Sequence, residues 1–179
     1  MDEIILRRLS LKDIPALSLI AKKTFYDTFS GTCTAEDMNH FLEMYYNENA
    51  LAVEMADEEM HYYFVEINWE IAGYILYKEN NIGFEEMKNK KVIELKRLYV
   101  LGIYHGKKLA QKMMDAFLAY ATNNNFDIAF LGVWEYNCRA QYFYAKYGFK
   151  PTAHRHDFPI GNTSQADVYL IKELNNNQQ

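Results

Sequence analysis

The segment with the clearest potential for chemistry is a strand, a tight loop and a helix start near the middle of the chain. VIELKRLYV (92–100) is rich in β-branched and apolar residues and predicts a strand, and a helix is expected over 107–122. Free backbone N–H groups and the positive end of the helix dipole bind anions at such a junction. Residues 105–110 are therefore a candidate cradle for a diphosphate.

The second candidate segment is the helix expected over about 138–147, which follows the apolar run DIAFLGVW (127–134). Asn137 stands at its N-cap position, and Gly148 closes it as the C-cap residue. Tyr144 lies seven residues after Asn137, so the two side chains share one helix face two turns apart. The other aromatic residues of this helix are expected in the core: Tyr142, Phe143 and Tyr147.

This second segment resembles a signature of the GNAT N-acetyltransferase superfamily, Asn-x-x-Ala-x-x-x-Tyr-x-x-x-Gly-Phe. The matching residues, at the same spacing, are Asn137, Ala140, Tyr144, Gly148 and Phe149. The chain is identified on this basis as a member of that superfamily, which implies an enzyme that uses acetyl-CoA.

The loop resembles the acetyl-CoA loop of the same superfamily, Gln/Arg-x-x-Gly-x-Gly/Ala, but departs from it at two positions. His105 stands where Gln or Arg is usual, Lys108 stands where the first Gly is usual, and Ala110 fills the last position. The Lys108 side chain must bend away from the diphosphate or pair its ammonium with it.

The resemblance implies that acetyl-CoA is the cosubstrate, and because the sequence contains no zinc motif we expect no metal. The strand backbone would bind the pantetheine as a neighbouring strand would, and polarise the thioester carbonyl. The residues expected to contact the cofactor are Leu98, Tyr99, Val100, His105, Gly106, Lys107, Lys108, Leu109, Ala110, Asn137, Ala140, Tyr144 and Lys146.

A narrower resemblance is to the PaiA-type branch, which acetylates polyamines such as spermidine and spermine. It is carried by 24–29, 36–38, 131–135, 156–158 and 165–167. The resemblance implies a small cationic amine as acceptor. Four acidic residues near the second helix are compatible with a polycation, although each is more typical of a solvated helix face: Glu36, Asp37, Glu43 and Glu48.

The mechanism implied by the family is direct transfer within a ternary complex. An amine of pKa ~10.4 is mostly protonated at neutral pH, and its deprotonation costs roughly 4 to 5 kcal/mol. Glu94 is the candidate base, although a surface glutamate on this strand is an equal alternative. Tyr144 is the candidate acid for the CoA thiolate, at a cost of ~2 kcal/mol from reference pKa values.

Other interpretations remain open from the sequence. The acceptor could instead be an amino acid, an antibiotic or a protein amine. The departures at His105 and Lys108 are also compatible with a non-catalytic sensor of acyl-CoA, against which Asn137 and Tyr144 argue. His154-x-His156 places two imidazoles on one strand face without any further feature of a zinc motif.

The elements that must position these residues follow from hydrophobic periodicity and turn residues. A strand is expected over 3–9, then a helix capped by Ser10 or Asp13, and then a helix opened by the capping box Thr34–Asp37. The remaining strands are expected at 61–67, 70–78, 150–157 and 166–173. This order predicts a mixed α+β fold, with a mostly antiparallel sheet of about six to seven strands and helices on both faces.

Length and composition bound the remaining properties. The 179 residues fit one domain over 1–174, followed by a frayed polar tail at 175–179. A net charge of −5 disfavours nucleic acid and anionic membranes as partners. The start MDEIILRRLS is atypical of a secretory signal, and two cysteines predict a reducing compartment, the cytoplasm. The sequence does not distinguish a monomer from a homodimer.

Overall fold

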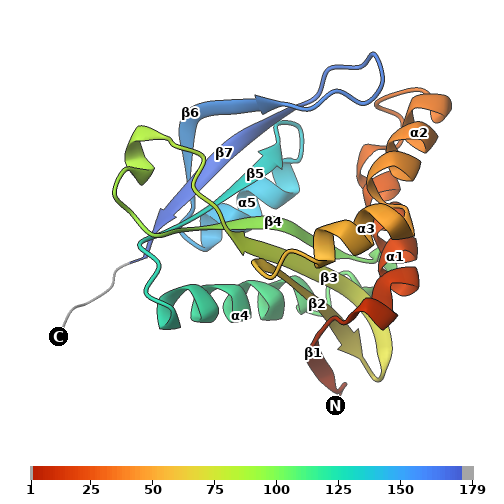
Figure 1. The fold of residues 1–179 in the computed structure, drawn as a ribbon, viewed down its shortest axis with the longest axis horizontal. Helices are drawn as coiled ribbons and strands as arrows, with labels where there is room; N and C mark the ends of the chain where they lie inside the picture. Colours follow the sequence, from red (N-terminus) through yellow and green to blue (C-terminus); the bar gives the residue numbers. More distant parts are fainter. Residues whose placement is uncertain (1, 175–179) are drawn as a thin grey trace.

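The computed structural model describes residues 2–174, and the expected tail at 175–179 lies outside the described residues. A seven-stranded sheet in the order β1-β2-β3-β4-β5-β7-β6 forms its centre (Figure 1). The strands are β1 (Ile4–Arg8), β2 (Met60–Ile67), β3 (Glu70–Glu79), β4 (Val92–Val100), β5 (Ile128–Trp134), β6 (Lys150–Asp157) and β7 (Ala166–Glu173). Within these residues β4 and β5 pair in parallel and the other neighbours are antiparallel. The expected mixed fold is confirmed.

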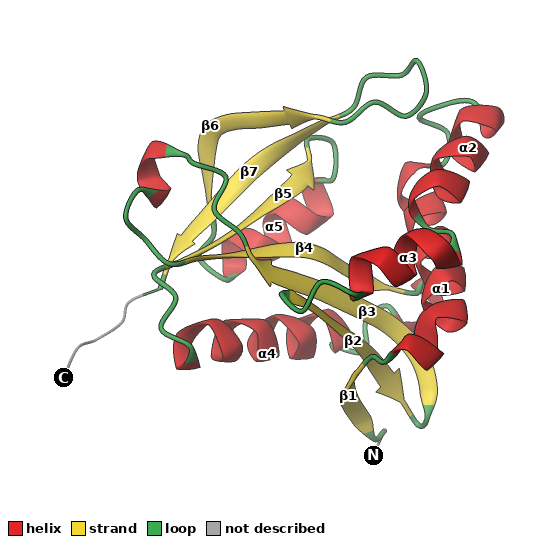
Figure 2. Ribbon diagram, in the orientation of Figure 1, coloured by secondary structure: helices red, strands yellow, loops and turns green. Residues whose placement is uncertain are grey.

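Helices cover both faces of the sheet (Figure 2). The helices are α1 (Ile14–Phe29), α2 (Ala35–Tyr45), α3 (Glu48–Met55), α4 (Leu109–Asn123) and α5 (Cys138–Lys146). Leu17 and Phe25 of α1 pack with α2, α3 and one sheet face, whereas Met113 and Phe117 of α4 pack with α5 on the other. The loop 105–110 and the second signature thus belong to one layer, and α1 belongs to the opposite layer.

The sheet opens in its middle, because β4 and β5 pair over a short stretch and then separate. The pairing joins Val92–Glu94 to Ile128–Phe130, after which β5 continues along β7 as far as Trp134. A β-bulge in β4 at Lys96 accompanies the separation. The later part of β4 therefore presents an edge without a partner strand among the described residues.

Alternation along β4 decides which backbone groups face this opening. The Leu101 N–H donates to the Ala72 carbonyl oxygen at 2.9 Å, so groups at every second residue before Leu101 point toward β3. The N–H and C=O groups of Leu98 and Val100 consequently point into the opening. They are the groups that an extended ligand could meet as a neighbouring strand would.

Element boundaries agree with the expected ones to within a few residues. The Thr34 hydroxyl accepts from the Asp37 N–H at 3.1 Å, as the capping box requires. A 3-10 turn at Leu11–Asp13 precedes α1, and α4 begins at Leu109, two residues later than expected. The reason for the late start is that Lys108 takes a left-handed conformation at φ 61°, which no α-helix contains.

No helix within 2–174 is long and apolar enough to cross a membrane.

Candidate active site

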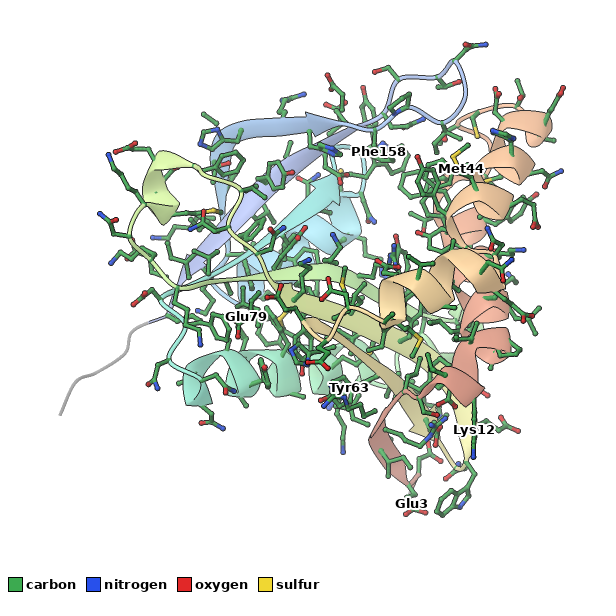
Figure 3. All side chains as sticks on the ribbon, viewed as in Figure 1. Glu3, Lys12, Met44, Tyr63, Glu79 and Phe158 are labelled. Atoms are coloured by element: carbon green, nitrogen blue, oxygen red, sulfur yellow. The ribbon has the colours of Figure 1, made fainter. Side chains whose placement is uncertain are left out.

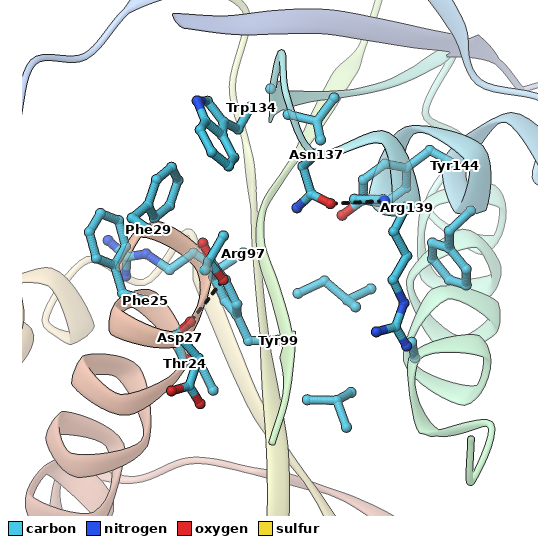
Figure 4. Close-up of a pocket in the computed structure, with 18 of the residues that line it drawn as sticks. Thr24, Phe25, Asp27, Phe29, Arg97, Tyr99, Trp134, Asn137, Arg139 and Tyr144 are labelled. Carbon is cyan, nitrogen blue, oxygen red and sulfur yellow. Dashed lines mark hydrogen bonds between the residues drawn. The ribbon is translucent and has the colours of Figure 1, made fainter. Parts of the chain in front are cut away.

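A cleft of about 600 Å³ occupies the opening between β4 and β5. Figure 4 shows α1 side chains on one side, α5 side chains on the other, and Tyr99 of β4 between them. Phe158, in the segment between β6 and β7, also lines the cleft, and Figure 3 shows it directed toward the helical layer that carries Met44. The cleft therefore has walls from both helical layers and a floor of sheet backbone.

The floor consists of the expected strand residues. Leu98, Tyr99 and Val100 all line the cleft. His105 adds a link to this floor, because its Nε2 donates to the Val100 carbonyl oxygen at 3.0 Å. Arg139 of α5 donates to the His105 Nδ1 at 3.2 Å. A carbonyl can accept only and a guanidinium can donate only, so the ring carries its proton on Nε2 and joins β4 to α5.

The start of α4 has the properties of an anion site. No side chain caps this helix, so its first N–H groups lack an intrahelical acceptor. Gly106 at φ 85° and Lys108 at φ 61° shape the turn before it. Lys108 thus holds the left-handed conformation that glycine favours at the family's first Gly position. Its side chain is exposed and outside the cleft lining.

The other expected residues of the loop divide between the cleft and other roles. Ala110 lines the cleft, whereas Leu109 is 1% exposed and belongs to the core. The Lys107 ammonium pairs with Asp2 at 3.0 Å on the surface. These positions leave the backbone of 105–110, rather than its side chains, as the group available to a diphosphate.

Helix α5 and its N-cap residue bring three residues of the second signature to the cleft. The Asn137 side-chain oxygen accepts from the Ala140 N–H at 3.1 Å, which confirms Asn137 as the N-cap. Asn137, Ala140 and Tyr144 all line the cleft. Lys146 does not, because its ammonium lies over the Tyr142 ring, 4.5 Å from the centroid, on the exposed side of the helix.

Tyr144 is the buried phenol of this site. It is 8% exposed, and burial, reinforced by the Asp167 carboxylate, raises its pKa well above the ordinary value. The phenol consequently keeps its proton throughout the physiological pH range. That is the state a proton donor needs before a leaving group develops charge.

The structure does not bring Glu94 to the cleft. Its Oε2 accepts from the Asn80 side-chain amide at 2.7 Å and lies 3.5 Å from the Lys96 ammonium. Glu94 stands opposite Phe130, where β4 and β5 are still joined. Glu94 is not among the residues that line the cleft. The expectation of Glu94 as the base therefore loses its geometric support.

Asp167 is a cleft residue to which the sequence analysis gave no chemical role. It lies on β7 opposite Trp134 of β5 and lines the cleft. Burial raises the pKa of its carboxyl from 3.8 to about 7. The signal in the sequence was a single acidic residue in the otherwise apolar start of ADVYLI (166–171).

One end of the cleft, here called the aromatic end, is formed by Phe25, Phe29, Trp134 and Phe158. Phe29 is central, with ring centroids 4.5 Å from Phe25, 5.1 Å from Trp134 and 5.5 Å from Phe158. Asp27 of α1 also lines the cleft, is exposed, and pairs with Lys23.

The four acidic residues expected near a polycation are not among the lining residues of this cleft: Glu36, Asp37, Glu43 and Glu48. Asp37 serves the N-terminal cap of α2, and Glu43 pairs with Lys22 at 2.6 Å. His154 stacks on Phe84 at 3.7 Å and lies 3.2 Å from the Glu86 carboxylate. Within 2–174 no group of three His, Cys, Asp or Glu side chains is placed to hold a metal ion.

Comparison with known proteins agrees with the geometry. A sequence profile of the acetyltransferase (GNAT) domain matches residues 29–158. A protein described as an uncharacterized N-acetyltransferase in the pepI 3′ region of Lactobacillus delbrueckii subsp. lactis is 30% identical over 171 residues, which cover 93% of this chain and 95% of that protein. An uncharacterized N-acetyltransferase of Mycobacterium bovis is 40% identical over 82 residues, 46% of this chain and 52% of the relative.

Solved structures share the fold at lower identity. The PaiA N-acetyltransferase of Thermoplasma acidophilum, solved in complex with coenzyme A, superposes with a TM-score of 0.75 at 20% identity, over 96% of this chain and 99% of that one. A GCN5-related N-acetyltransferase of Rhodopseudomonas palustris gives 0.74 at 16% identity, over 95% of each chain. The family profile matches most of the chain, and a relative is 30% identical over 95% of its length. The sheet opens beside an uncapped helix start. The chain therefore belongs to the GNAT family and is an acetyl-CoA-dependent N-acetyltransferase.

Proposed function

We propose that the enzyme acetylates a primary amine of a small polyamine, such as spermidine or spermine, by direct attack in a ternary complex. The observation that carries the proposal is the composition of the aromatic end of the cleft. Its four aromatic rings line the same cleft as the carboxylates of Asp27 and Asp167. A short alkyl chain with several ammonium groups complements such a surface.

The rings offer both apolar contact and attraction for cations. Phe29 and Trp134 lie at 5.1 Å and 53°, and Phe158 closes edge-on against Phe29. A cation over an aromatic face within about 6 Å of its centre gains roughly 0.5 to 2 kcal/mol, most when desolvated. Methylene groups between two ammonium groups would pack against the same rings.

Two basic residues of the cleft, Arg97 and Lys96, have carboxylate partners, whereas Arg139 contacts His105 in the loop 105–110. The Arg97 guanidinium donates to the Glu54 carboxylate at 2.8 Å and lies over the Tyr46 ring at 5.2 Å. The Lys96 ammonium lies 3.5 Å from Glu94. Arg97 and Lys96 are thus balanced locally, and Asp27 is balanced by Lys23. Asp167 is the carboxylate of the cleft that has no cationic partner among the described residues, and we expect it to attract a cationic acceptor.

The proposed transfer uses the parts of the cleft in a fixed order. The backbone groups of Leu98 and Val100 would bind the pantetheine. The N–H groups at the start of α4 would bind the diphosphate. The amine would attack the thioester carbon from the aromatic end, and the carbon–sulfur bond would break. Tyr144 would then give its proton to the departing sulfur. Burial raises the pKa of a thiolate as well as that of a phenol, so the two stay close enough for transfer.

The relatives give this proposal limited support. One neighbour with the same fold is named PaiA N-acetyltransferase, and the sequence resembles that branch at five short segments. Other neighbours of similar fold carry different names, including a ribosomal-protein-alanine N-acetyltransferase of Brucella melitensis.

The test is an acceptor screen with acetyl-CoA and detection of the free CoA thiol. The panel comprises spermidine, spermine, putrescine, free amino acids, an aminoglycoside and a peptide with an N-terminal alanine. We expect kcat/KM for spermidine or spermine to exceed that for every non-polyamine by at least tenfold. Higher kcat/KM with an amino acid, the aminoglycoside or the peptide would overturn the polyamine proposal. Binding of acetyl-CoA without turnover of any acceptor would favour a sensor.

A further inference from the structure

Asp167 lies in the cleft beside a glycine, which leaves space for its carboxylate. It projects from β7 beside β5, and the residue next to it on the same face is Gly132. A Cβ atom on Gly132 would lie 3.0 Å from the Asp167 Oδ2, closer than nearly all ordinary contacts of this kind. Any larger residue at 132 would therefore displace the carboxylate.

The surroundings of Asp167 differ from those of the other acidic residues near the cleft. Asp27 is exposed and paired with Lys23, and Glu94 accepts from Asn80. Within 2–174 no hydrogen-bond donor or cation contacts the Asp167 carboxylate. The carboxylate is thus half-buried, free of a structural partner and open to a ligand in the cleft.

The titratable groups that face Asp167 come from four elements. Tyr144 of α5, Tyr99 of β4 and Tyr169 of β7 each have a pKa raised by burial and further by the Asp167 charge. His156 of β6 pairs with Asp167 in the β6–β7 register and is exposed. The three phenols are neutral near pH 7, so the ammonium of an acceptor is the charge that would meet this carboxylate.

We infer that Asp167, rather than Glu94, accepts the proton of the acceptor's ammonium before attack on the thioester. The inference rests on acetyl transfer to an amine and holds for any amine the enzyme accepts.

The protons balance over one cycle. One N–H bond breaks as its proton goes to an Asp167 oxygen, and the freed nitrogen lone pair forms the bond to the carbonyl carbon. The carbon–sulfur bond breaks, and the sulfur takes the Tyr144 proton. The nitrogen loses a second proton, which restores Tyr144 through water, and Asp167 releases its proton to solvent.

The raised pKa suits this role. A carboxylate of pKa about 7 accepts a proton roughly a thousandfold more readily than one at the ordinary value of 3.8. It is nevertheless ionised in an appreciable fraction of molecules at neutral pH. A general base is most effective when its pKa lies near the working pH.

The experiment compares Asp167→Asn with Glu94→Gln, since each replaces a carboxylate by an amide of the same shape. Acceptor turnover is measured from pH 5.5 to 9.5 with the best amine of the screen, and acetyl-CoA affinity by calorimetry. We expect Asp167→Asn to lower kcat by about 10² to 10⁴ while the Kd of acetyl-CoA stays within threefold. Glu94→Gln should retain kcat within threefold.

The pH profile separates a proton acceptor from a structural residue. Wild-type kcat/KM should rise with pH through an acid limb near 7, and Glu94→Gln should keep that limb. In Asp167→Asn this limb should be absent, and kcat/KM should rise in proportion to the fraction of acceptor present as free amine up to pH 9.5. An unchanged limb in Asp167→Asn, or loss of kcat in Glu94→Gln instead, would overturn the inference.

A third measurement needs no acceptor. Carboxyl-¹³C NMR of aspartate-labelled protein, assigned with Asp167→Asn, reports the titration of this group directly. We expect a midpoint near 7, and a midpoint near 4 would contradict the inference. If spermidine is not acetylated but another amine is, the polyamine proposal fails while the role of Asp167 is tested with that amine.

Discussion

The Asp167 carboxylate and the Tyr144 phenol reach the same cleft from β7 and α5, and the charge of the first raises the pKa of the second. Burial alone raises the pKa of Asp167 to about 7, so the cleft pairs a phenol that keeps its proton with a carboxyl that titrates near neutrality. Acid and base roles are commonly divided between groups whose surroundings separate their pKa values in this way. In acetyl transfer from a thioester to an amine, Asp167 would accept a proton from the ammonium and Tyr144 would donate one to the departing sulfur.

Replacement of Tyr144 by Phe tests the acid end. The ring and its packing against Phe149 at 6.0 Å remain, whereas the hydroxyl is lost. Thiolate departure would then depend on water, and loss of a general acid typically costs ~10² to 10⁴ in rate. We expect kcat to fall by that amount and the Kd of acetyl-CoA to change by less than fivefold. Retention of more than a third of wild-type kcat with the best acceptor would make Tyr144 a packing residue.

Asp167→Asn should also change the pH dependence of stability. Because the folded pKa, about 7, lies above the ordinary 3.8, the native state binds more protons than the unfolded state between these values. The contribution of Asp167 should therefore lower the free energy of unfolding of the wild type as pH rises from about 4 to about 7. The asparagine variant lacks that decline. It should be more stable than wild type by on the order of 2 to 4 kcal/mol at pH 8, with little difference near pH 4.

Urea unfolding followed by circular dichroism at pH 4.5, 6 and 8 gives this comparison. Equal stability differences at all three pH values would show that Asp167 titrates as an ordinary exposed aspartate. The measurement is independent of any acceptor.

Lys108 offers a test of what holds the diphosphate. Lys108→Gly removes the ammonium and the strain of a left-handed lysine, and Lys108→Ala removes the ammonium alone. We expect both variants to bind acetyl-CoA within about tenfold of wild type, because backbone N–H groups provide the contacts. Lys108→Gly should be the more stable of the two by roughly 1 kcal/mol. A loss of affinity beyond about a hundredfold in both, ~2.7 kcal/mol, would identify the ammonium as a principal ligand.

The Arg97–Glu54 pair tests the charge argument for a cationic acceptor. The two side chains are 17% and 19% exposed and meet at 2.8 Å. Glu54→Gln leaves the guanidinium without its counter-charge in the cleft wall, which should cost about 3 kcal/mol of stability. It should also raise KM for a polyamine about tenfold and leave KM for acetyl-CoA nearly unchanged. An unaltered polyamine KM would show that the charge of Arg97 does not reach the acceptor.

The positions of Asn137, Tyr144 and Lys108 were predictable because their determinants are local. The spacing from Asn137 to Tyr144 fixes one helix face, and Lys108 lies in a turn whose conformation depends on a few neighbouring residues. Glu94 lies outside the cleft lining because β4 and β5 are still paired there, and the point at which the two strands separate depends on long-range pairing that no local pattern reports. Asp167 acquires its properties from burial between β5, β7 and α5, and no local pattern in the sequence reports such burial.

Gly132→Ala would move the Asp167 carboxylate without removing it. The added methyl group would lie 3.0 Å from Oδ2 and 3.4 Å from Cβ of Asp167, so the side chain must shift by a few tenths of an ångström. Misplacement of a proton acceptor by such an amount should lower kcat about tenfold, since proton transfer depends steeply on donor–acceptor geometry. In the Asp167→Asn background the same methyl group has no carboxylate to displace, and its effect on kcat should fall below twofold. A double-mutant cycle on kcat measures this coupling directly. If Gly132→Ala lowers kcat equally in both backgrounds, the methyl group acts on cofactor binding or packing instead. Gly132 would then not be required for the position of the Asp167 carboxylate.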